Sequence, residues 1–266
     1  MKRIFLSADI EGTCGIAHWD ETEKTHQDYA YFANQMTLEV QAACNGALAG
    51  GASEILVKDA HDSGRNINPV LLPKEASVFR GWARDLYGMM SGIKKGDAGV
   101  FFTGYHSSSG RDGNPLAHTM NGQNNYIKIN GEKASELHIN GLIASHFQVP
   151  VRFVCADEAL CTWIKEKVPQ VVTVETIKGV GNGTISLHPE VAIEKIRQGA
   201  EASMSIPTKQ LLFPMEEEYE IEINYKNHYL AKRNGHYPGA MQKDSHTIVY
   251  KSTLFVEVLR FILFCL

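Results

Sequence analysis

The first sixty residues hold two apolar runs on either side of a segment with helical spacing, and this order constrains the fold more than any other feature. The apolar runs are residues 3–6 and 54–58. Between them, residues 29–48 place apolar side chains along one helical face and stop at a Gly-Gly pair. A strand, a helix and a second strand in this order form a right-handed crossover unit with parallel strands. We therefore predict an α/β fold, with a mostly parallel sheet and flanking helices.

The same alternation continues to about residue 204, after which the sequence changes character. The pattern predicts further strands and helices at 97–103, 151–155, 158–168, 171–177 and 189–204. Residues 218–224 instead alternate polar and apolar side chains, which is typical of a strand with one solvent-facing side. We predict a large α/β domain over residues 1–215 and a smaller C-terminal α+β region or assembly surface over residues 216–266.

Three of the predicted strands end in side chains of the types that bind metals. Asp9 and Glu11 follow the first strand, His61 the second and His106 the third. Asp9 and Glu11 lie two residues apart and point the same way, and the carboxyl ends of parallel strands meet at one edge of the sheet. An isolated Asp-x-Glu is equally well explained as a solvated turn closed by Gly12, and a single histidine is more often a hydrogen-bonded loop residue. The repetition favours a shared site.

Glu136 follows a predicted hairpin and begins a predicted helix. Asn130-Gly131 is a strong signal for a two-residue hairpin turn. Ser135 can cap the helix that follows, and Glu136 in its first turn suits the helix dipole, a role that needs no ligand. Glu136 therefore joins the candidate site only through its place in the larger set.

The set as a whole indicates a metal centre. Imidazole nitrogens together with carboxylate oxygens are typical of zinc, cobalt or manganese, whereas magnesium and calcium prefer all-oxygen sites. Two histidines and three carboxylates suffice for two metal ions, with Asp9 the simplest bridge between them. A two-metal centre of this kind suits the hydrolysis of an amide bond.

These motifs resemble the D-aminopeptidase family in order and spacing, from the first residue to the terminal helix. They are Asp9-Ile10-Glu11-Gly12, Lys58-Asp59-Ala60-His61, Gly104-Tyr105-His106, Ala117-His118-Thr119-Met120 and Ser135-Glu136-Leu137. The resemblance implies that Asp9, Glu11, His61, His106 and Glu136 bind two zinc ions (Zn2+) per subunit and that His118 is the catalytic histidine. It also implies a cytoplasmic ring-shaped homodecamer that removes an N-terminal D-residue, such as D-Ala, from short peptides. The loop over residues 17–26 has no match to the family that we can identify.

The role of His118 stays open among three possibilities. It follows a Gly- and Ser-rich stretch, residues 107–114, which suits a residue that meets substrate better than one that holds a metal. Its imidazole can transfer a proton, hydrogen-bond an oxyanion or attack the carbonyl itself. Because metals already supply nucleophile and electrophile, we favour proton transfer or oxyanion contact over covalent attack.

Composition limits the partners and the compartment. A formal net charge of −4 gives no basic surface for a nucleic acid. The five cysteines are odd in number and form no Cys-x-x-Cys pair, which predicts reduced thiols in a cytoplasmic protein. The apolar tail, residues 254–266, contains Glu257 and Arg260 and falls short of the roughly 18 residues that span a bilayer, so we predict no membrane partner. We expect a terminal helix packed on the protein or on a neighbouring subunit.

The same residues are also compatible with two other classes of function. An Asp-x-Glu after a first strand also begins RNase H-like 3′–5′ exonucleases, but these need a late Asp that is preceded at short spacing by His or Tyr, and we find no such match near His246 or Tyr250. A non-enzymatic, ring-forming ligand-binding protein would use the same side chains only as hydrogen-bonding groups. The other histidines are assigned surface or hydrogen-bonding roles: His18, His26, His138, His146, His188, His228, His236 and His246.

Overall fold

Seven strands form the larger of two sheets in this protein. The computed structural model describes residues 2–266. The strand order in this sheet is β3-β2-β1-β4-β7-β8-β9, and all neighbours are parallel except β8 and β9. The strands are β1 (Arg3–Ala8), β2 (Glu54–Asp59), β3 (Ala76–Phe79), β4 (Gly99–Tyr105), β7 (Val151–Asp157), β8 (Val172–Val180) and β9 (Gly183–Ser186). The prediction of a mostly parallel α/β fold is confirmed.

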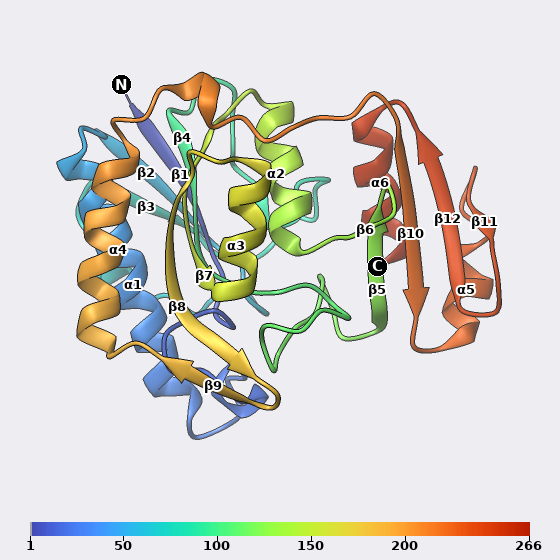
Figure 1. The fold of residues 1–266 in the computed structure, drawn as a ribbon, viewed down its shortest axis with the longest axis horizontal. Coiled ribbons are helices and arrows are strands. Elements are labelled where there is room, and N and C mark those ends of the chain that lie inside the picture. Colours follow the sequence, from blue (N-terminus) through green and yellow to red (C-terminus); the bar gives the residue numbers. More distant parts are fainter. Residues whose placement is uncertain (1) are drawn as a thin grey trace.

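Helices cover both faces of this sheet, because its strands are apolar on both sides. Helices α1 (Tyr29–Ala49) and α4 (Pro189–Ser203) lie together on one face, and α2 (Glu136–His146) and α3 (Glu158–Lys167) cover the other (Figure 1). Alternate residues of β1 accordingly enter different cores. Ile4 packs in the core that includes α1 and α4, whereas the next residue, Phe5, packs in the core that includes α2 and α3.

A second, antiparallel sheet stands beside the first and contains segments from two distant parts of the chain. Its order is β11 (Met241–Gln242), β12 (Thr247–Ser252), β10 (Tyr219–Tyr225), β5 (Asn124–Ile129) and β6 (Glu132–Lys133). Helices α5 (His228–Asn234) and α6 (Phe255–Cys265) accompany it (Figure 1). Its apolar side chains belong to the same core as α2 and α3, so the two sheets share one apolar interior.

The strands of the second sheet come from both sides of the predicted domain boundary at residue 215. The C-terminal segment builds it only together with β5 and β6, because β10 pairs with β5 and extends the Asn130-Gly131 hairpin. That hairpin has the predicted turn, with φ of 49° at Asn130 and 82° at Gly131. The boundary between residues 1–215 and 216–266 stays a prediction, and a structural division would have to move residues 124–133 to the smaller unit.

The predicted strands and helices agree with the structure, with small shifts at their ends, whereas β3, β9, β11, β12 and α5 were not predicted. The third predicted strand begins at Gly99, not at residue 97, because the Asp97 carboxylate accepts hydrogen bonds from Arg3 and from the backbone N–H of Lys94. Short 3-10 helices lie at Trp19–Glu21 (η1), Pro69–Leu71, Gly88–Met90 and Thr208–Gln210. All five cysteines are buried and free, as the sequence predicts.

The helices of this protein are too short or too polar to cross a membrane. Within the described part of the chain, no helix has both the length and the apolar character that a membrane crossing needs.

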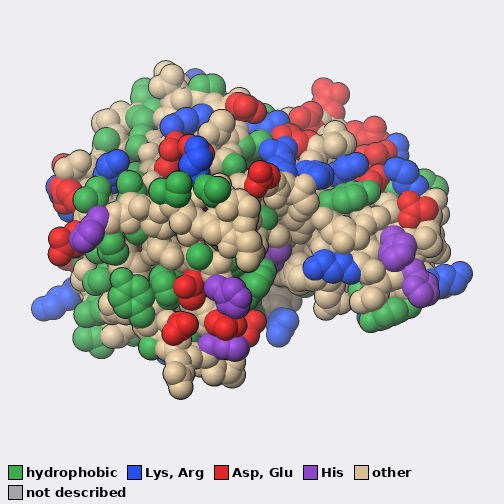
Figure 2. Space-filling view, turned by 60° about the horizontal axis from the view of Figure 1, so that its bottom comes forward, with side chains coloured by type: hydrophobic (Ala, Val, Ile, Leu, Met, Phe, Trp, Pro, Cys, Tyr) green, Lys and Arg blue, Asp and Glu red, His purple; other side chains and the backbone are tan. Residues whose placement is uncertain are grey.

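Figure 2 shows acidic and histidine side chains gathered around η1, where His18 and His26 are exposed and lie near Asp20. These two histidines are on the surface, as predicted.

Candidate metal centre and active site

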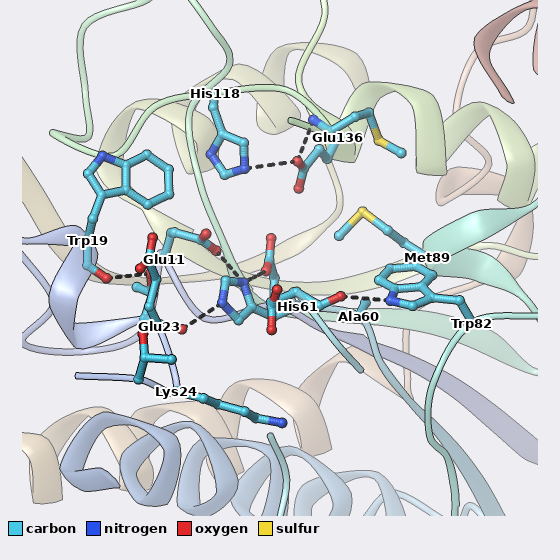
Figure 3. A pocket seen from close by; sticks show the side chains of 15 residues that line it. Glu11, Trp19, Glu23, Lys24, Ala60, His61, Trp82, Met89, His118 and Glu136 are labelled. Carbon is cyan, nitrogen blue, oxygen red and sulfur yellow. Dashed lines mark hydrogen bonds and ion pairs between the residues drawn. The ribbon is translucent and has the colours of Figure 1, made fainter. Parts of the chain in front are cut away.

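Three strand ends and one helix start bring the predicted side chains to one place. Asp9 and Glu11 follow β1, His61 follows β2, His106 follows β4, and Glu136 is the first residue of α2. All five are buried. Four of them line a cavity of about 410 Å3 together with His118 (Figure 3). His106 does not line this cavity but lies next to Asp9.

The two oxygens of the Asp9 carboxylate face different histidines. Asp9 Oδ1 lies 3.3 Å from Nδ1 of His61, and Asp9 Oδ2 lies 3.5 Å from Nε2 of His106. Glu11 Oε2 approaches the same His61 nitrogen at 3.3 Å, and Glu136 Oε2 approaches the same His106 nitrogen at 3.5 Å. Asp9, Glu11 and His61 therefore form one group of potential ligands, and Asp9, His106 and Glu136 form a second. Asp9 belongs to both.

Backbone carbonyls fix the orientation of all three imidazole rings. Nε2 of His61 lies 2.9 Å from the carbonyl oxygen of Thr22, and Nδ1 of His106 lies 3.0 Å from that of Ser107. Nδ1 of His118 is likewise 3.0 Å from a backbone carbonyl oxygen. A carbonyl oxygen only accepts, so these nitrogens carry the proton and the other nitrogen of each ring faces the carboxylates. This is how metal-binding histidines are usually held.

Three polar atoms of the cluster are buried without a hydrogen-bond partner among the described residues. They are Glu11 Oε2, His106 Nε2 and Glu136 Oε2. A buried polar atom that lacks a partner costs about 1–3 kcal/mol, so three in one cluster need an explanation. All three face the interior of the group described above. The donor set and its orphaned atoms therefore fit divalent cations of the zinc type.

Burial and the charges of neighbouring side chains shift the pKa values of the cluster strongly. Burial raises the pKa of Asp9 to about 7, and the carboxylates of Glu11 and Glu136 add to this effect. Burial lowers the pKa of histidine, yet Glu11 and Asp9 hold the pKa of His61 well above its usual value, and Glu136 and Asp9 do the same for His106. Burial would raise the pKa of Glu11, but His61 holds it well below the ordinary range. The three carboxylates therefore favour a positive charge at this site, which a protonated imidazole or a bound cation can supply.

Two glycines in the sequence motifs permit the close approach of β1 and β4. The N–H of Gly12 donates to the carbonyl oxygen of Gly104 at 2.8 Å. A Cβ on Gly12 would overlap the carbonyl oxygen of Tyr105, and a Cβ on Gly104 would overlap that of Asp9. Gly104 also has φ of +67°, which favours glycine. The glycines therefore allow the carboxylates that follow β1 to lie close to the histidine that follows β4.

The loop after β2 is held by a buried carboxylate that does not face the cluster. Asp59 Oδ2 accepts hydrogen bonds from the backbone N–H groups of Asn66 and Ile67, at 2.6 and 2.8 Å. The side-chain amide of Asn66 in turn donates to the carbonyl oxygen of His61 at 2.7 Å. Asp59 thus positions the backbone of His61.

His118 lies in the loop between β4 and β5, at the edge of the cavity. Its side chain is 16% exposed, and Nε2 lies 3.6 Å from Glu136 Oε1. The ring stacks on His106, with centroids 4.4 Å apart, and Trp19 packs edge-on against it. Its nitrogen also lies near ligand atoms of Glu11 and His106. The geometry therefore allows His118 to meet a substrate or to approach a metal.

Sequence reasoning missed several residues that line the cavity. Figure 3 shows Trp19 beside His118 at one end and Trp82 with Met89 at the other. Others come from the loop that follows Gly12 and from the loop that follows His118: Thr22, Glu23, Lys24, Thr25 and Met120. These residues lie in loops without periodicity, so the sequence carries no signal that they return to the strand ends.

One of the remaining histidines differs from its prediction. His138 is 7% exposed and packs against the rings of Trp163 and Phe213, and its Nδ1 has no hydrogen-bond partner among residues 2–266. Burial lowers its pKa to about 4. The assignment of a surface or hydrogen-bonding role was wrong, because its position on α2 faces the apolar core and not the solvent.

Comparisons with known proteins identify relatives of this chain. The family model described as D-aminopeptidase, peptidase family M55, matches residues 1–264. A D-aminopeptidase of Bacillus subtilis (strain 168) is 24% identical over 250 residues, covering 93% of this chain and 90% of its own length. The solved structure described as the Zn-dependent D-aminopeptidase DppA from Bacillus subtilis, a self-compartmentalizing protease, superposes with a TM-score of 0.91. It has 22% sequence identity and covers 99% of this chain and 96% of its own.

The match spans nearly the whole chain and includes every strand end that carries a member of the cluster. The fold of this chain also matches that of the solved D-aminopeptidase along nearly its full length. The chain therefore belongs to the D-aminopeptidase family, peptidase family M55.

Proposed function

We propose that this protein is a zinc-dependent aminopeptidase that releases an N-terminal D-amino acid, such as D-Ala, from short peptides. The observation that carries the proposal is the buried cluster in which unpartnered carboxylate and imidazole atoms face one another. Family membership supports the reaction, and the names of the relatives, D-aminopeptidase and Zn-dependent D-aminopeptidase, support the stereochemistry and the metal.

Two zinc ions would divide the cluster between them. We assign Asp9, Glu11 and His61 to one ion and Asp9, His106 and Glu136 to the other, with Asp9 as the bridge. The two Asp9 oxygens face different histidines, which supports this division. When bound, the ions would lower the pKa of water and polarise the substrate carbonyl.

His118 is the proposed catalytic histidine. Its Nδ1–H is held by a backbone carbonyl, so Nε2 is the atom that can take a proton and return it to the leaving amine, or hydrogen-bond an oxyanion. Packing against Trp19 and His106 limits rotation of the ring and so orients that nitrogen. Covalent attack by the imidazole is the less favoured route.

The lining of the cavity suits the amino end of a peptide. Besides the cluster, Glu23 and Asp62 place carboxylates at the cavity, and both can attract a protonated amine. Trp82, Met89 and Met120 supply an apolar wall for a side chain. An RNase H-like exonuclease would hold magnesium with oxygen ligands alone, so the histidines argue against it.

We also propose that the protein is a cytoplasmic homo-oligomer, with a ring of ten subunits as the expected assembly. Leu254, Leu263 and Phe264 in and beside α6 are 64%, 41% and 66% exposed, and large exposed apolar side chains favour a protein partner. The solved relative is described as self-compartmentalizing, which supports an enclosed assembly. We expect residues 1–215 to carry the catalysis and residues 216–266 to contribute to assembly.

A metal and activity assay tests the proposal. Protein purified without chelator is analysed for bound metals and assayed with D-alanyl and L-alanyl peptides of the same sequence. We expect about two zinc ions per chain and faster release of the D-residue. A fully folded protein without metal, or one that hydrolyses neither peptide after zinc is restored, would contradict the proposal and favour a non-enzymatic ligand-binding role.

A further inference from the structure

A second cavity adjoins the one at the metal cluster. It measures about 580 Å3 and shares Asp62, Trp82 and Met120 with the first cavity. Its far wall comes from the end of α6, through Ile262, Leu263 and Leu266. The same three residues line both cavities, so the two adjoin at Asp62, Trp82 and Met120.

The rim shared by the two cavities is fixed by hydrogen bonds and packing. The indole N–H of Trp82 donates to the carbonyl oxygen of Asp62 at 2.7 Å, and the ammonium of Lys58 lies 4.2 Å from the indole ring centroid. Lys58 is buried and also donates to the carbonyl oxygen of Gly81 at 2.7 Å. On the opposite side, the N–H of Met120 donates to Glu136 at 2.7 Å. The shared rim therefore has a defined position relative to the cluster.

The two cavities differ in charge. The first is lined by four carboxylates besides that of Asp62, whereas the second is lined by two guanidinium groups, those of Arg65 and Arg84. Both arginines are exposed, and neither guanidinium has an ion pair or a side-chain hydrogen bond within residues 2–266. The carboxylate of Asp85 in the second cavity is already engaged, because it accepts hydrogen bonds from Tyr87, Gly88 and Ser91.

We propose that Arg65 and Arg84 bind the C-terminal carboxylate of the peptide substrate. This inference rests on the proposed aminopeptidase function. A short peptide carries an ammonium at one end and a carboxylate at the other. The two adjoining cavities carry carboxylates in the first and unpaired guanidinium groups in the second, so a peptide that extends past Trp82 and Met120 would meet both. Guanidinium groups bind carboxylates through paired, charge-assisted hydrogen bonds. Arg65 and Arg84 therefore select short peptides with a free carboxyl end and set the favoured length.

The test compares D-alanyl peptides of two to four residues with the same peptides as C-terminal amides, using the zinc-loaded enzyme. We expect the amide to raise KM about 5- to 10-fold at one peptide length, with kcat nearly unchanged, since an exposed charge pair contributes to ground and transition states alike. An extended chain grows by roughly 3.3–3.6 Å per residue, so the effect should fall for longer and shorter peptides. The double variant Arg65→Gln/Arg84→Gln should lose the discrimination between acid and amide.

Arg80→Gln is the matched control, because Arg80 is an exposed arginine near the same loops that lines neither cavity. It should keep the wild-type ratio of KM values. An equal KM for acid and amide at every length in the wild type, or the same loss of discrimination in Arg80→Gln, would overturn the inference while leaving the proposed peptidase intact.

Direct binding separates this result from a failure of the proposed function. The zinc-loaded His118→Ala variant is titrated calorimetrically with the acid and the amide of the best-length peptide, which requires no turnover. Tighter binding of the acid, lost in the Arg65/Arg84 double variant, supports the carboxylate site even if hydrolysis is absent. Equal binding of the two peptides, or no binding of either, refutes it.

Discussion

Replacing His118 with alanine separates the chemistry of the site from its metal binding. The Nε2 atom of His118 faces Glu136, but each of the two ligand groups joined through Asp9 is complete without it. We therefore expect His118→Ala to keep nearly normal zinc content. We expect turnover to fall by roughly 10²–10⁴-fold, the usual loss for a missing general acid–base, which corresponds to about 2.7–5.4 kcal/mol.

The structural cost of the same change is smaller. His118 is 16% exposed, and its removal loses the edge contact with Trp19 and the stack on His106. Aromatic contacts of this kind contribute about 0.5–1.5 kcal/mol each, so a loss of about 1–3 kcal/mol in the free energy of unfolding is expected. A domain with ordinary stability of about 5–15 kcal/mol stays almost wholly folded after that loss. Unfolding therefore cannot account for a hundredfold fall in turnover.

Three measurements on one preparation decide the matter: metal content, steady-state hydrolysis of a D-alanyl peptide, and urea denaturation. Zinc lost in proportion to activity would show that His118 is a ligand, and the assignment of the site would be wrong. Unchanged turnover would remove His118 from the mechanism altogether. An acyl-imidazole trapped by rapid quench and seen by mass spectrometry would replace proton transfer with covalent attack.

The other predictions concern the metal centre, acid stability, strand approach and assembly. His106→Ala should bind about one zinc ion fewer per chain and lose hydrolysis, measured by metal analysis alongside circular dichroism; full zinc content would contradict it. Burial depresses the pKa of His138 from its usual 6.5 to about 4, so its contribution to stability is present above pH 6.5 and is lost as pH falls toward 4. That loss is about 3 kcal/mol between pH 7.5 and pH 4, and the His138→Phe variant should not show it in urea titrations at these two pH values. An equal loss of stability in the wild type and the variant would contradict the prediction. Gly12→Ala should cost at least about 2 kcal/mol, whereas Gly122→Ala, whose Cβ would meet nothing within 4 Å, should be nearly neutral; similar values would refute the close-approach argument. Phe264→Glu should shift the sedimentation profile toward smaller species, and a wild-type monomer at micromolar concentration would rule out the proposed oligomer.

The strand ends of this protein could be located from the sequence because their information is local. Apolar runs mark buried strands, and the residue that follows each run is carried to the same edge of a parallel sheet whatever the rest of the chain does. Asp9, Glu11, His61 and His106 lie together for this reason. The hairpin at Asn130-Gly131 and the cap at Ser135 are equally local, because each depends on the backbone preference or side-chain reach of one or two residues.

Contacts between distant segments were decided only by the tertiary structure. β10 pairs with β5 although the two strands are far apart in sequence, because periodicity tells which side of a strand is buried but not which strand is its neighbour. The loop around η1 brings the carbonyl of Thr22 to His61, and no pattern in a polar loop encodes that return. The burial of His138 and the place of Trp82 in the walls of two adjoining cavities also depend on how separate elements pack. The sequence by itself thus determined which side chains reach the sheet edge, since alternation along a strand is a property of the strand alone. Only the packing of separate segments decided what surrounds those side chains, since it depends on contacts among residues that no local pattern connects.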